Sequence, residues 1–213
     1  MGQRPTAAQL HRTSAPRHRA PAAPKTITAS IFATPLGWIG VAGTEKIVVA
    51  LTIGHASSDE VRSALATRLD SPAAETNGSL EERDWYPELR RALERYAQGQ
   101  PVDLRPFKID LGPTTPYRKR VLETARRIPY GKTMSYGELA TRSGKPRAAR
   151  AVGSAMASNP IALLVPCHRV VAAGGAIGGF SCRTGVELKQ RLLDMEAQGA
   201  RGKSHGTPAA RLL

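Results

Sequence analysis

Apolar and polar positions alternate along residues 26–34, where every second side chain is apolar, as in a half-buried strand. Two further apolar runs follow at 38–42 and 47–51, and a short glycine-containing turn precedes each of them. The pattern therefore predicts three consecutive strands that form an antiparallel meander.

Helical periodicity then replaces alternation. Ser57 and Glu60 form a capping-box pattern, which predicts a helix that continues to Leu69. Pro87 suits the first turn of a second helix, which ends near Gly99. The first half of the chain thus mixes strands and helices.

The remaining segments of this half carry weaker signals. Residues 70–83 are polar and predict a loop, whereas residues 104–111 predict one more strand. We therefore interpret 26–111 as a small α+β domain without clear chemistry of its own. Residues 1–25 contain five Lys or Arg and no acidic residue among many Ala and Pro, which predicts a disordered basic tail.

Three helices are predicted next. The first spans 115–128, with Thr115 as N-cap and Pro116 at its first position. A capping box predicts a short helix at 135–142, and a further helix is predicted at 146–156. Two short helices joined by a glycine-containing turn are typical of a helix-turn-helix.

The helix predicted at 146–156 consists mainly of Ala, Gly and Ser, interrupted by Arg147 and Arg150. Small side chains permit either close packing inside the protein or insertion into the narrow minor groove of DNA. Basic side chains that could contact phosphates, or merely form a solvated face, are Arg118, Lys119, Arg120, Arg126, Arg127, Lys132 and Lys145.

The overall charge supports an acidic partner. The net charge is +14 and the pI is about 10.6, which favours nucleic acid first and an anionic membrane second over an uninvolved basic surface. Two cysteines, Cys167 and Cys182, exclude a disulfide scaffold and a cysteine-based structural zinc site. Without a signal peptide or an apolar run of membrane-spanning length, we expect a cytoplasmic protein, associated with the nucleoid in a bacterium.

One stretch carries reactive chemistry. The apolar run 161–165 predicts a buried strand that Pro166 ends, and Cys167, His168 and Arg169 follow. A thiol reacts as its thiolate, which a neighbouring base or cation makes available. The alternative is a buried and inert cysteine.

A reactive thiol beside a DNA-binding helix implies chemistry on a base that has been turned out of the stack. Arg150 would then fill the gap that the base leaves. Its alternative role is a phosphate contact or an ordinary surface charge.

Four motifs, in this order and spacing, carry a resemblance to a known family: 131–136 (GKTMSY), 146–153 (PRAARAVG), 159–160 (NP) and 166–171 (PCHRVV). The stretch from about Thr115 to Ala197 resembles the O6-alkylguanine-DNA alkyltransferases. The resemblance implies an α+β fold with two parts: a ribonuclease-H-like N-terminal domain at 26–111 and a mostly helical alkyltransferase domain with the helix-turn-helix at 112–198. Residues 199–213, which lie outside the resemblance, are expected to form a flexible tail.

The resemblance also implies roles for individual residues. Cys167 would accept the alkyl group, His168 would act as its base through a water, Glu196 would orient His168, and Asn159 would brace the turn that carries the cysteine. The substrate would contact Tyr136, Met156, Val170, Phe180 and Ser181. DNA would contact Tyr136, Arg147, Ala148, Ala149, Arg150 and Gly153, with Arg150 as the finger that replaces the extruded base.

The implied activity is irreversible, single-turnover transfer of a methyl or other alkyl group from O6 of guanine in duplex DNA, with O4 of thymine as a second candidate position. The resemblance implies no metal and no cofactor. The expected partner is double-stranded DNA bound through its minor groove, with no membrane. A monomer is expected, and cooperative binding along DNA stays open.

The sequence departs from the family in two places. Cys182, Arg183 and Thr184 stand where many members have glycine-rich residues in the closing loop, and Arg191 replaces a common Trp. Thr184 with Glu187 still predicts a cap for the final helix.

Three other functions compete with alkyl transfer. A non-catalytic relative that binds alkylated DNA would lack the acceptor cysteine, which this chain has at Cys167. A helix-turn-helix transcription factor would be indifferent to Cys167→Ala. A cysteine hydrolase would turn over repeatedly, and nothing else in the chain supports it.

Overall fold

The sheet of the first half consists of five strands in the order β4-β1-β2-β3-β5. The computed structural model describes residues 27–69, 80–180 and 185–202. The predicted meander is confirmed, because β1 (Ile27–Thr34), β2 (Gly37–Thr44) and β3 (Ile47–His55) pair antiparallel in sequence order.

Two short edge strands complete this sheet, and both correct the prediction. β4 (Leu80–Glu82) pairs parallel with β1, although 70–83 was predicted to be a loop. β5 (Lys108–Ile109) pairs parallel with β3, so the strand predicted at 104–111 is reduced to two residues. Neither is set by its own sequence pattern, because each forms only where an existing strand edge offers its backbone groups.

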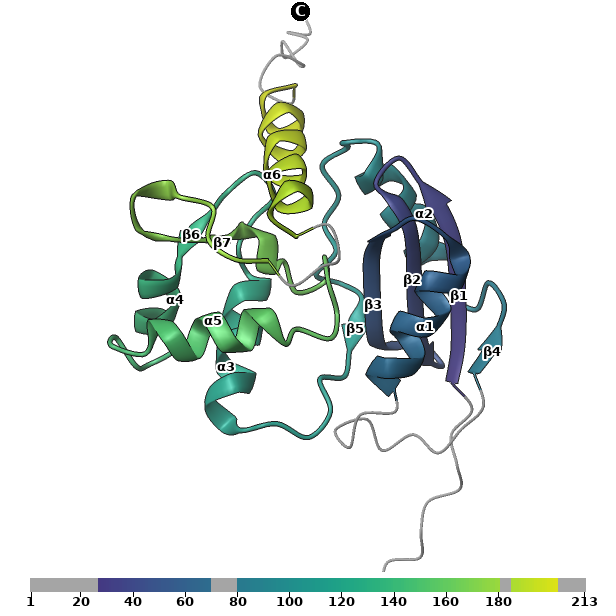
Figure 1. The fold of residues 1–213 in the computed structure, drawn as a ribbon, viewed down its shortest axis with the longest axis horizontal. Helices are drawn as coiled ribbons and strands as arrows, with labels where there is room; N and C mark the ends of the chain where they lie inside the picture. Colours follow the sequence, from purple (N-terminus) through teal and green to yellow (C-terminus); the bar gives the residue numbers. More distant parts are fainter. Residues whose placement is uncertain (1–26, 70–79, 181–184, 203–213) are drawn as a thin grey trace, which may run out of the picture.

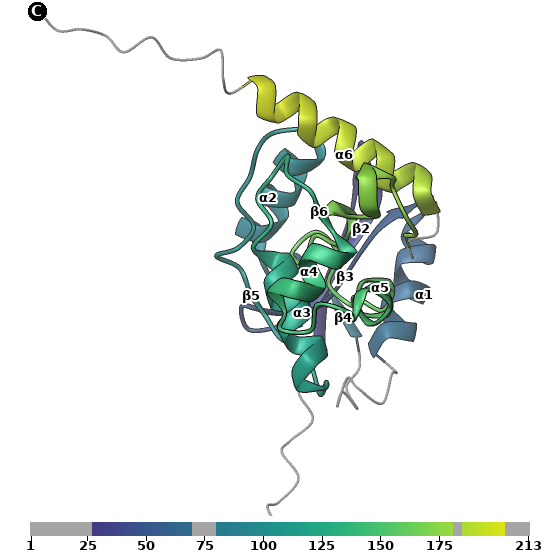
Figure 2. The ribbon, with the colours of Figure 1, turned by 90° about the vertical axis from the view of Figure 1, so that its left-hand side faces the viewer.

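Helices cover opposite faces of this sheet (Figures 1 and 2). α1 (Ser58–Leu69) packs on the face that carries Ile27 and Ala29, whereas α2 (Pro87–Ala97) packs on the face that carries Phe32. Alternate side chains of one strand point to opposite faces, so both faces of β1 are buried. The α2 face looks toward the second half of the chain.

The second half is built around three helices, α3 (Pro116–Arg126), α4 (Tyr136–Arg142) and α5 (Ala149–Ala157), which share one apolar core. The predicted caps are confirmed: Thr115 accepts a hydrogen bond from the Arg118 amide, and the capping box of α4 is complete. α5 begins three residues later than predicted, because the chain forms a turn at 146–147 before it becomes helical.

Two parallel strands of two residues each, β6 (Met134–Ser135) and β7 (Val170–Val171), connect α4 to the segment around Cys167. That segment begins with the 3₁₀ turn η1 (Cys167–Arg169), and a second turn, η2 (Ala173–Gly175), follows β7.

α6 (Gly185–Gly202) runs across one end of both halves (Figure 2). It continues through residues 199–202, which were predicted to belong to the C-terminal tail. Gly199 lets α6 pack closely against Gly99 and Tyr130, because a Cβ at position 199 would lie 2.4 Å from the Gly99 carbonyl oxygen and 2.6 Å from the Tyr130 hydroxyl. The predicted tail of residues 1–25 lies outside the described residues, as do residues 203–213.

The apolar run 161–165 is buried as predicted but does not form a strand. Ile161 makes an isolated bridge to Leu51 of β3, and Leu163 then adopts a positive φ of 64°. This bend directs the apolar side chains of the run into the core on the α2 face. The two halves therefore share a core immediately before Cys167.

Candidate active site

Cys167 lies at the first position of η1, where the shared core meets the core of α3, α4 and α5. Its side chain is 6% exposed, and its amide donates to the Val165 carbonyl at 2.8 Å. Burial raises the pKa of the Cys167 thiol, while a hydrogen bond from Asn159 and the charge of Lys189 act in the opposite direction.

Asn159, just beyond α5, braces the turn that carries the cysteine. Its Nδ2 donates to the Val165 carbonyl at 2.8 Å, and its Oδ1 accepts from the Ile161 amide at 3.1 Å. Arg68 of α1 donates from Nη1 to the Asn159 carbonyl at 3.0 Å. Both ends of the bend before Cys167 are thus tied to one buried amide side chain.

His168 points away from solvent and contacts Glu196 of α6. Its Nε2 lies 2.9 Å from Glu196 Oε1, and both side chains are 1% exposed. Because a carboxylate only accepts, Nε2 carries the hydrogen and Nδ1 remains the basic nitrogen of the neutral ring. Burial lowers the pKa of His168, and Glu196 acts against that effect.

Glu196 is held by more groups than His168. Arg169 donates to it from Nη2 at 2.8 Å and from Nε at 2.9 Å, and the Gly131 amide donates at 3.0 Å. Burial alone would raise the pKa of Glu196, but His168 and Arg169 outweigh burial and hold that pKa well below its ordinary value. Glu196 therefore stays ionised, and Arg169 forms a buried ion pair with its carboxylate.

An apolar wall surrounds the thiol. Met156 and Val170 are buried in the same cluster as Cys167, and Tyr136 and Phe180 are partly buried against it. The Tyr136 hydroxyl donates to the Gly179 carbonyl at 3.4 Å. The structure thus brings together four of the five residues predicted to contact the substrate, while Ser181 lies outside the described residues.

Two further residues reach this site, and sequence reasoning assigned neither to it. Lys189 of α6 is fully buried and donates from Nζ to the carbonyls of Val170, at 2.6 Å, and Gly179, at 3.2 Å. A charged residue seven positions before Glu196, on the same buried stripe, was the available signal. Tyr96 of α2 contacts both His168 and Glu196, and its sequence position showed only a buried helix face.

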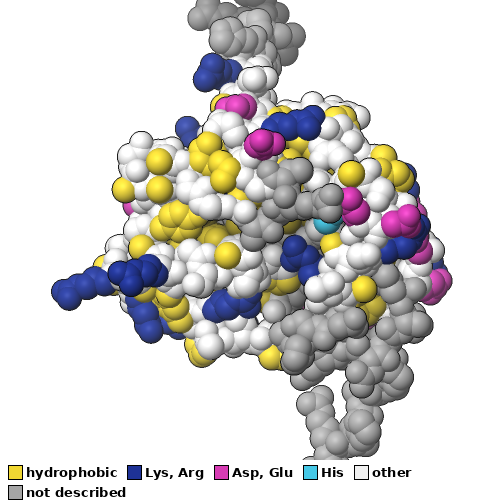
Figure 3. Space-filling model, in the orientation of Figure 1, with side chains coloured by type: hydrophobic (Ala, Val, Ile, Leu, Met, Phe, Trp, Pro, Cys, Tyr) yellow, Lys and Arg dark blue, Asp and Glu magenta, His cyan; other side chains and the backbone are white. Residues whose placement is uncertain are grey.

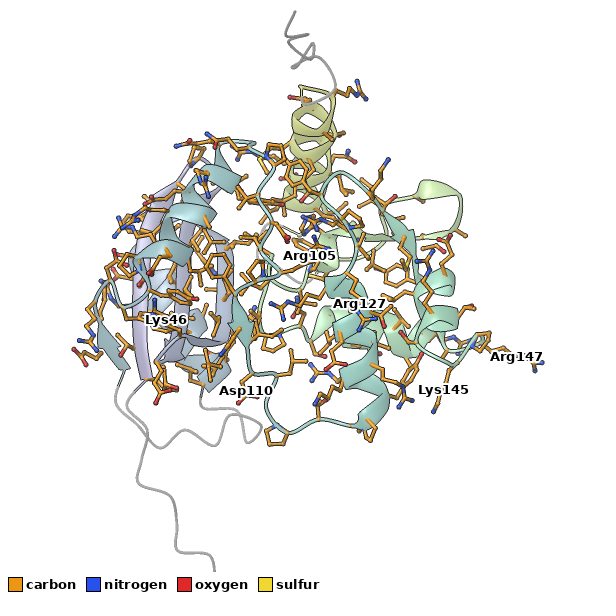
Figure 4. All side chains as sticks on the ribbon, turned by 180° about the vertical axis from the view of Figure 1, so that it is seen from behind. Lys46, Arg105, Asp110, Arg127, Lys145 and Arg147 are labelled. Carbon is orange, nitrogen blue, oxygen red and sulfur yellow. The ribbon has the colours of Figure 1, made fainter. Side chains whose placement is uncertain are left out.

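α5 presents its exposed side next to this site. Arg147 and Arg150 are exposed, while Ala148, Ala149 and Gly153 are half-buried. In Figure 4, Arg147 and the nearby Lys145 project away from the body of the protein. Lys and Arg side chains gather around α5 in Figure 3, whereas the Asp and Glu on that face lie mainly over α6 and the sheet.

Two negative findings apply to the described ranges. Within 27–69, 80–180 and 185–202, no three His, Cys, Asp or Glu residues lie close enough together to hold a metal ion. None of the helices in these ranges has both the length and the apolar character that crossing a membrane requires.

The site defines a protein with a buried cysteine, followed by a histidine that contacts a carboxylate, and with a helix that exposes Arg150 next to Arg147 and Lys145 in the preceding turn. Comparisons with known proteins agree with this class. Residues 116–198 match the family model for the DNA-binding domain of 6-O-methylguanine DNA methyltransferase. A methylated-DNA–protein-cysteine methyltransferase of Methanosarcina acetivorans is 34% identical over 168 residues, which are 78% of this chain and 96% of the relative.

Solved structures give the same result. Mycobacterium tuberculosis OGT in complex with DNA superposes with a TM-score of 0.63 at 30% identity, covering 81% of this chain and 94% of that one. The O6-methylguanine-DNA methyltransferase of Pyrococcus kodakaraensis gives 0.62 at 28% identity, covering 80% and 99%. The chain belongs to the methylated-DNA–protein-cysteine methyltransferase family.

Proposed function

We propose that this protein repairs DNA by direct reversal, taking an alkyl group from O6 of guanine onto the sulfur of Cys167. The observation that carries this proposal is that Cys167 directly precedes His168 in η1, and that His168 is bonded to Glu196, in a member of this family. The C–S bond forms as the C–O6 bond breaks, and guanine leaves with the electron pair and takes up a proton from solvent, while the proton that His168 receives from the thiol is released to solvent. The thiol proton passes to His168 through a water. Because the thioether is stable, each molecule reacts once.

The surrounding side chains have supporting roles. Glu196 orients His168, and Asn159 holds the turn that presents the thiol. Met156, Val170 and Phe180 form apolar walls for the flipped base, and Tyr136 hydrogen-bonds it. Ser181 is proposed to lie near O6 on the strength of the motif alone.

DNA is proposed to bind through its minor groove, with α4 and α5 acting as a helix-turn-helix. Residues 112–180 contain eleven Lys or Arg and two Glu, which favours contact with phosphates. A Cβ added at Gly153 would meet no atom within 4 Å, so α5 has open space for a closely approaching backbone. Arg150, exposed on this helix, is proposed to fill the gap left by the base.

The domain organisation, location and second substrate of the protein are also proposals. Residues 26–111 would form a ribonuclease-H-like domain that supports the alkyltransferase domain at 112–198. The protein would act as a cytoplasmic monomer, and alkylated O4 of thymine would be a second substrate.

A mass-spectrometric experiment tests the function. The full-length protein is incubated with a duplex that contains one O6-methylguanine, and its peptides are then mapped. We expect one methyl group on the Cys167 peptide, none with unmodified duplex and none with Cys167→Ala. If the folded protein binds the damaged duplex without adduct, it is a non-catalytic binding protein. Sequence-specific binding that ignores the lesion would indicate a transcription factor.

A further inference from the structure

α2, in the first half of the chain, sends one tyrosine into the centre of the site. Tyr96 is fully buried, and its hydroxyl donates to Glu196 Oε1 at 2.5 Å. The Tyr96 hydroxyl oxygen also lies 3.2 Å from Nε2 of His168. The Tyr96 oxygen and the carboxylate oxygen therefore both face the one N–H of the imidazole, and these three groups form a closed set of contacts.

The Tyr96 hydroxyl does more than fill space in the core. Glu196 already accepts hydrogen bonds from Arg169 and Gly131, so the carboxylate would remain paired if the tyrosine donated nothing. The Tyr96 hydroxyl instead bonds to the oxygen that also faces His168. A donor at Oε1 reduces the negative charge that this oxygen offers to His168. It also fixes the orientation of the carboxylate toward the His168 N–H.

We infer that Tyr96 is a positioning residue for alkyl transfer: its hydroxyl, acting through Glu196, keeps His168 neutral, with its hydrogen on Nε2 and Nδ1 free to take the thiol proton. The role assigned to Tyr96 rests on the proposed alkyl transfer. It also gives the first half of the chain an indirect part in the chemistry, through Glu196 and His168.

The sign of the expected effect follows from the groups that face His168. Glu196 favours the imidazolium, whereas Arg169 and Lys189 oppose it. Without the Tyr96 hydroxyl, more of the charge on Glu196 acts on His168, and the imidazolium is favoured. A protonated His168 cannot accept the thiol proton, so transfer should begin to fail at a higher pH.

A neighbouring tyrosine supplies a matched control. Tyr130 packs edge-to-face on Tyr96, with ring centroids 5.9 Å apart, but its hydroxyl donates to the Gly99 carbonyl at 2.9 Å. Tyr130→Phe therefore makes the same chemical change next to the same ring without removing a contact to His168 or to Glu196 Oε1.

The experiment measures the single-turnover rate of methyl transfer from O6-methylguanine duplex, as a function of pH, for wild type, Tyr96→Phe and Tyr130→Phe. For Tyr96→Phe we expect one methyl group per molecule at the end point and a rate about tenfold lower near neutral pH. The acidic limb of its profile should move to higher pH. Tyr130→Phe should keep the wild-type rate and profile.

A second variant keeps the test decisive if Tyr96→Phe folds poorly. 3-Fluorotyrosine placed at position 96 keeps the ring and the hydroxyl but makes the phenol a stronger donor, so the acidic limb should move to lower pH. Unchanged profiles in the soluble variants would overturn the role, as would a lower rate without a pH shift or equal effects at Tyr96 and Tyr130. Failure of the wild type to transfer methyl would instead overturn the proposed function.

Discussion

Replacing Glu196 with glutamine should destabilise the protein strongly, because it removes the charge that balances a buried arginine. Glu196 is 1% exposed and Arg169 is 7% exposed, so solvent screens this pair very little. Donors converge on both carboxylate oxygens: Tyr96, His168 and Arg169 on Oε1, and Gly131 and Arg169 on Oε2. Whichever way a glutamine amide is turned, its NH₂ group therefore faces other donors.

The magnitude follows from these contacts. Removing one partner of a buried ion pair costs about 3–5 kcal/mol. For a chain of this size, that loss lowers the unfolding midpoint by about 6–20 °C. Arg169 keeps its hydrogen bond to the Ile128 carbonyl, which favours the lower half of the range.

Denaturant unfolding of wild type, Glu196→Gln and Glu187→Gln measures this cost. Glu187 lies on the same helix and is exposed, so the same chemical change there should alter the free energy of unfolding by less than about 0.5 kcal/mol. A loss below about 1 kcal/mol for Glu196→Gln would refute the reasoning, because it would mean that the buried arginine does not need the carboxylate.

Three further predictions use other parts of the site. The folded protein holds the pKa of Glu196 below its ordinary value of 4.5, so this carboxylate stabilises the fold above pH 4.5, and its contribution is lost as pH falls below that value. Denaturant unfolding at pH 6 and at pH 3 should therefore show a smaller decrease in unfolding free energy for Glu196→Gln than for wild type. Asn159→Ala removes bonds to Ile161 and Val165 and should cost about 2–4 kcal/mol of unfolding free energy, whereas an equal cost for the exposed Ser158→Ala would contradict the bracing role. Arg150→Ala should still accept methyl from free O6-methylguanine base but lose most of its rate on duplex, and equal losses on both substrates would contradict the finger.

Local sequence signals predict those elements whose boundaries are fixed by neighbouring residues. The meander follows from alternation in β1 and from apolar runs separated by turns in β2 and β3. The starts of α3 and α4 follow from Thr115 and Ser135, whose side chains make the expected caps. The predictions that are wrong concern segments whose conformation depends on residues far away in the sequence. The run 161–165 reads as a strand, but Leu51 pairs with its first residues only and Leu163 then turns.

The same distinction holds for the site. The motif from Asn159 to His168 and the position of Glu196 could be assigned by resemblance. In the structure His168 contacts Glu196, and Asn159 bonds to the backbone just before Cys167. Tyr96 could not be found in this way, because its partner Glu196 is 100 residues away and a tyrosine on a helix stripe usually signals only burial. Buried polar partners from distant segments become visible only when the fold is known.

Burial of the thiol has a consequence for a protein that reacts once. Any oxidation or alkylation of Cys167 before a damaged base is bound would leave that molecule inactive. Its low exposure and the rise in its pKa on burial both slow reaction with small electrophiles. The groups that favour transfer, Asn159, His168 and Glu196, are themselves buried and already bonded to one another or to the backbone. In the proposed reaction, the flipped guanine displaces apolar and loop contacts, such as that of Tyr136 with Gly179, while the charged groups keep their bonds. The same burial that protects the thiol thus keeps the charged network ready for the base that DNA delivers.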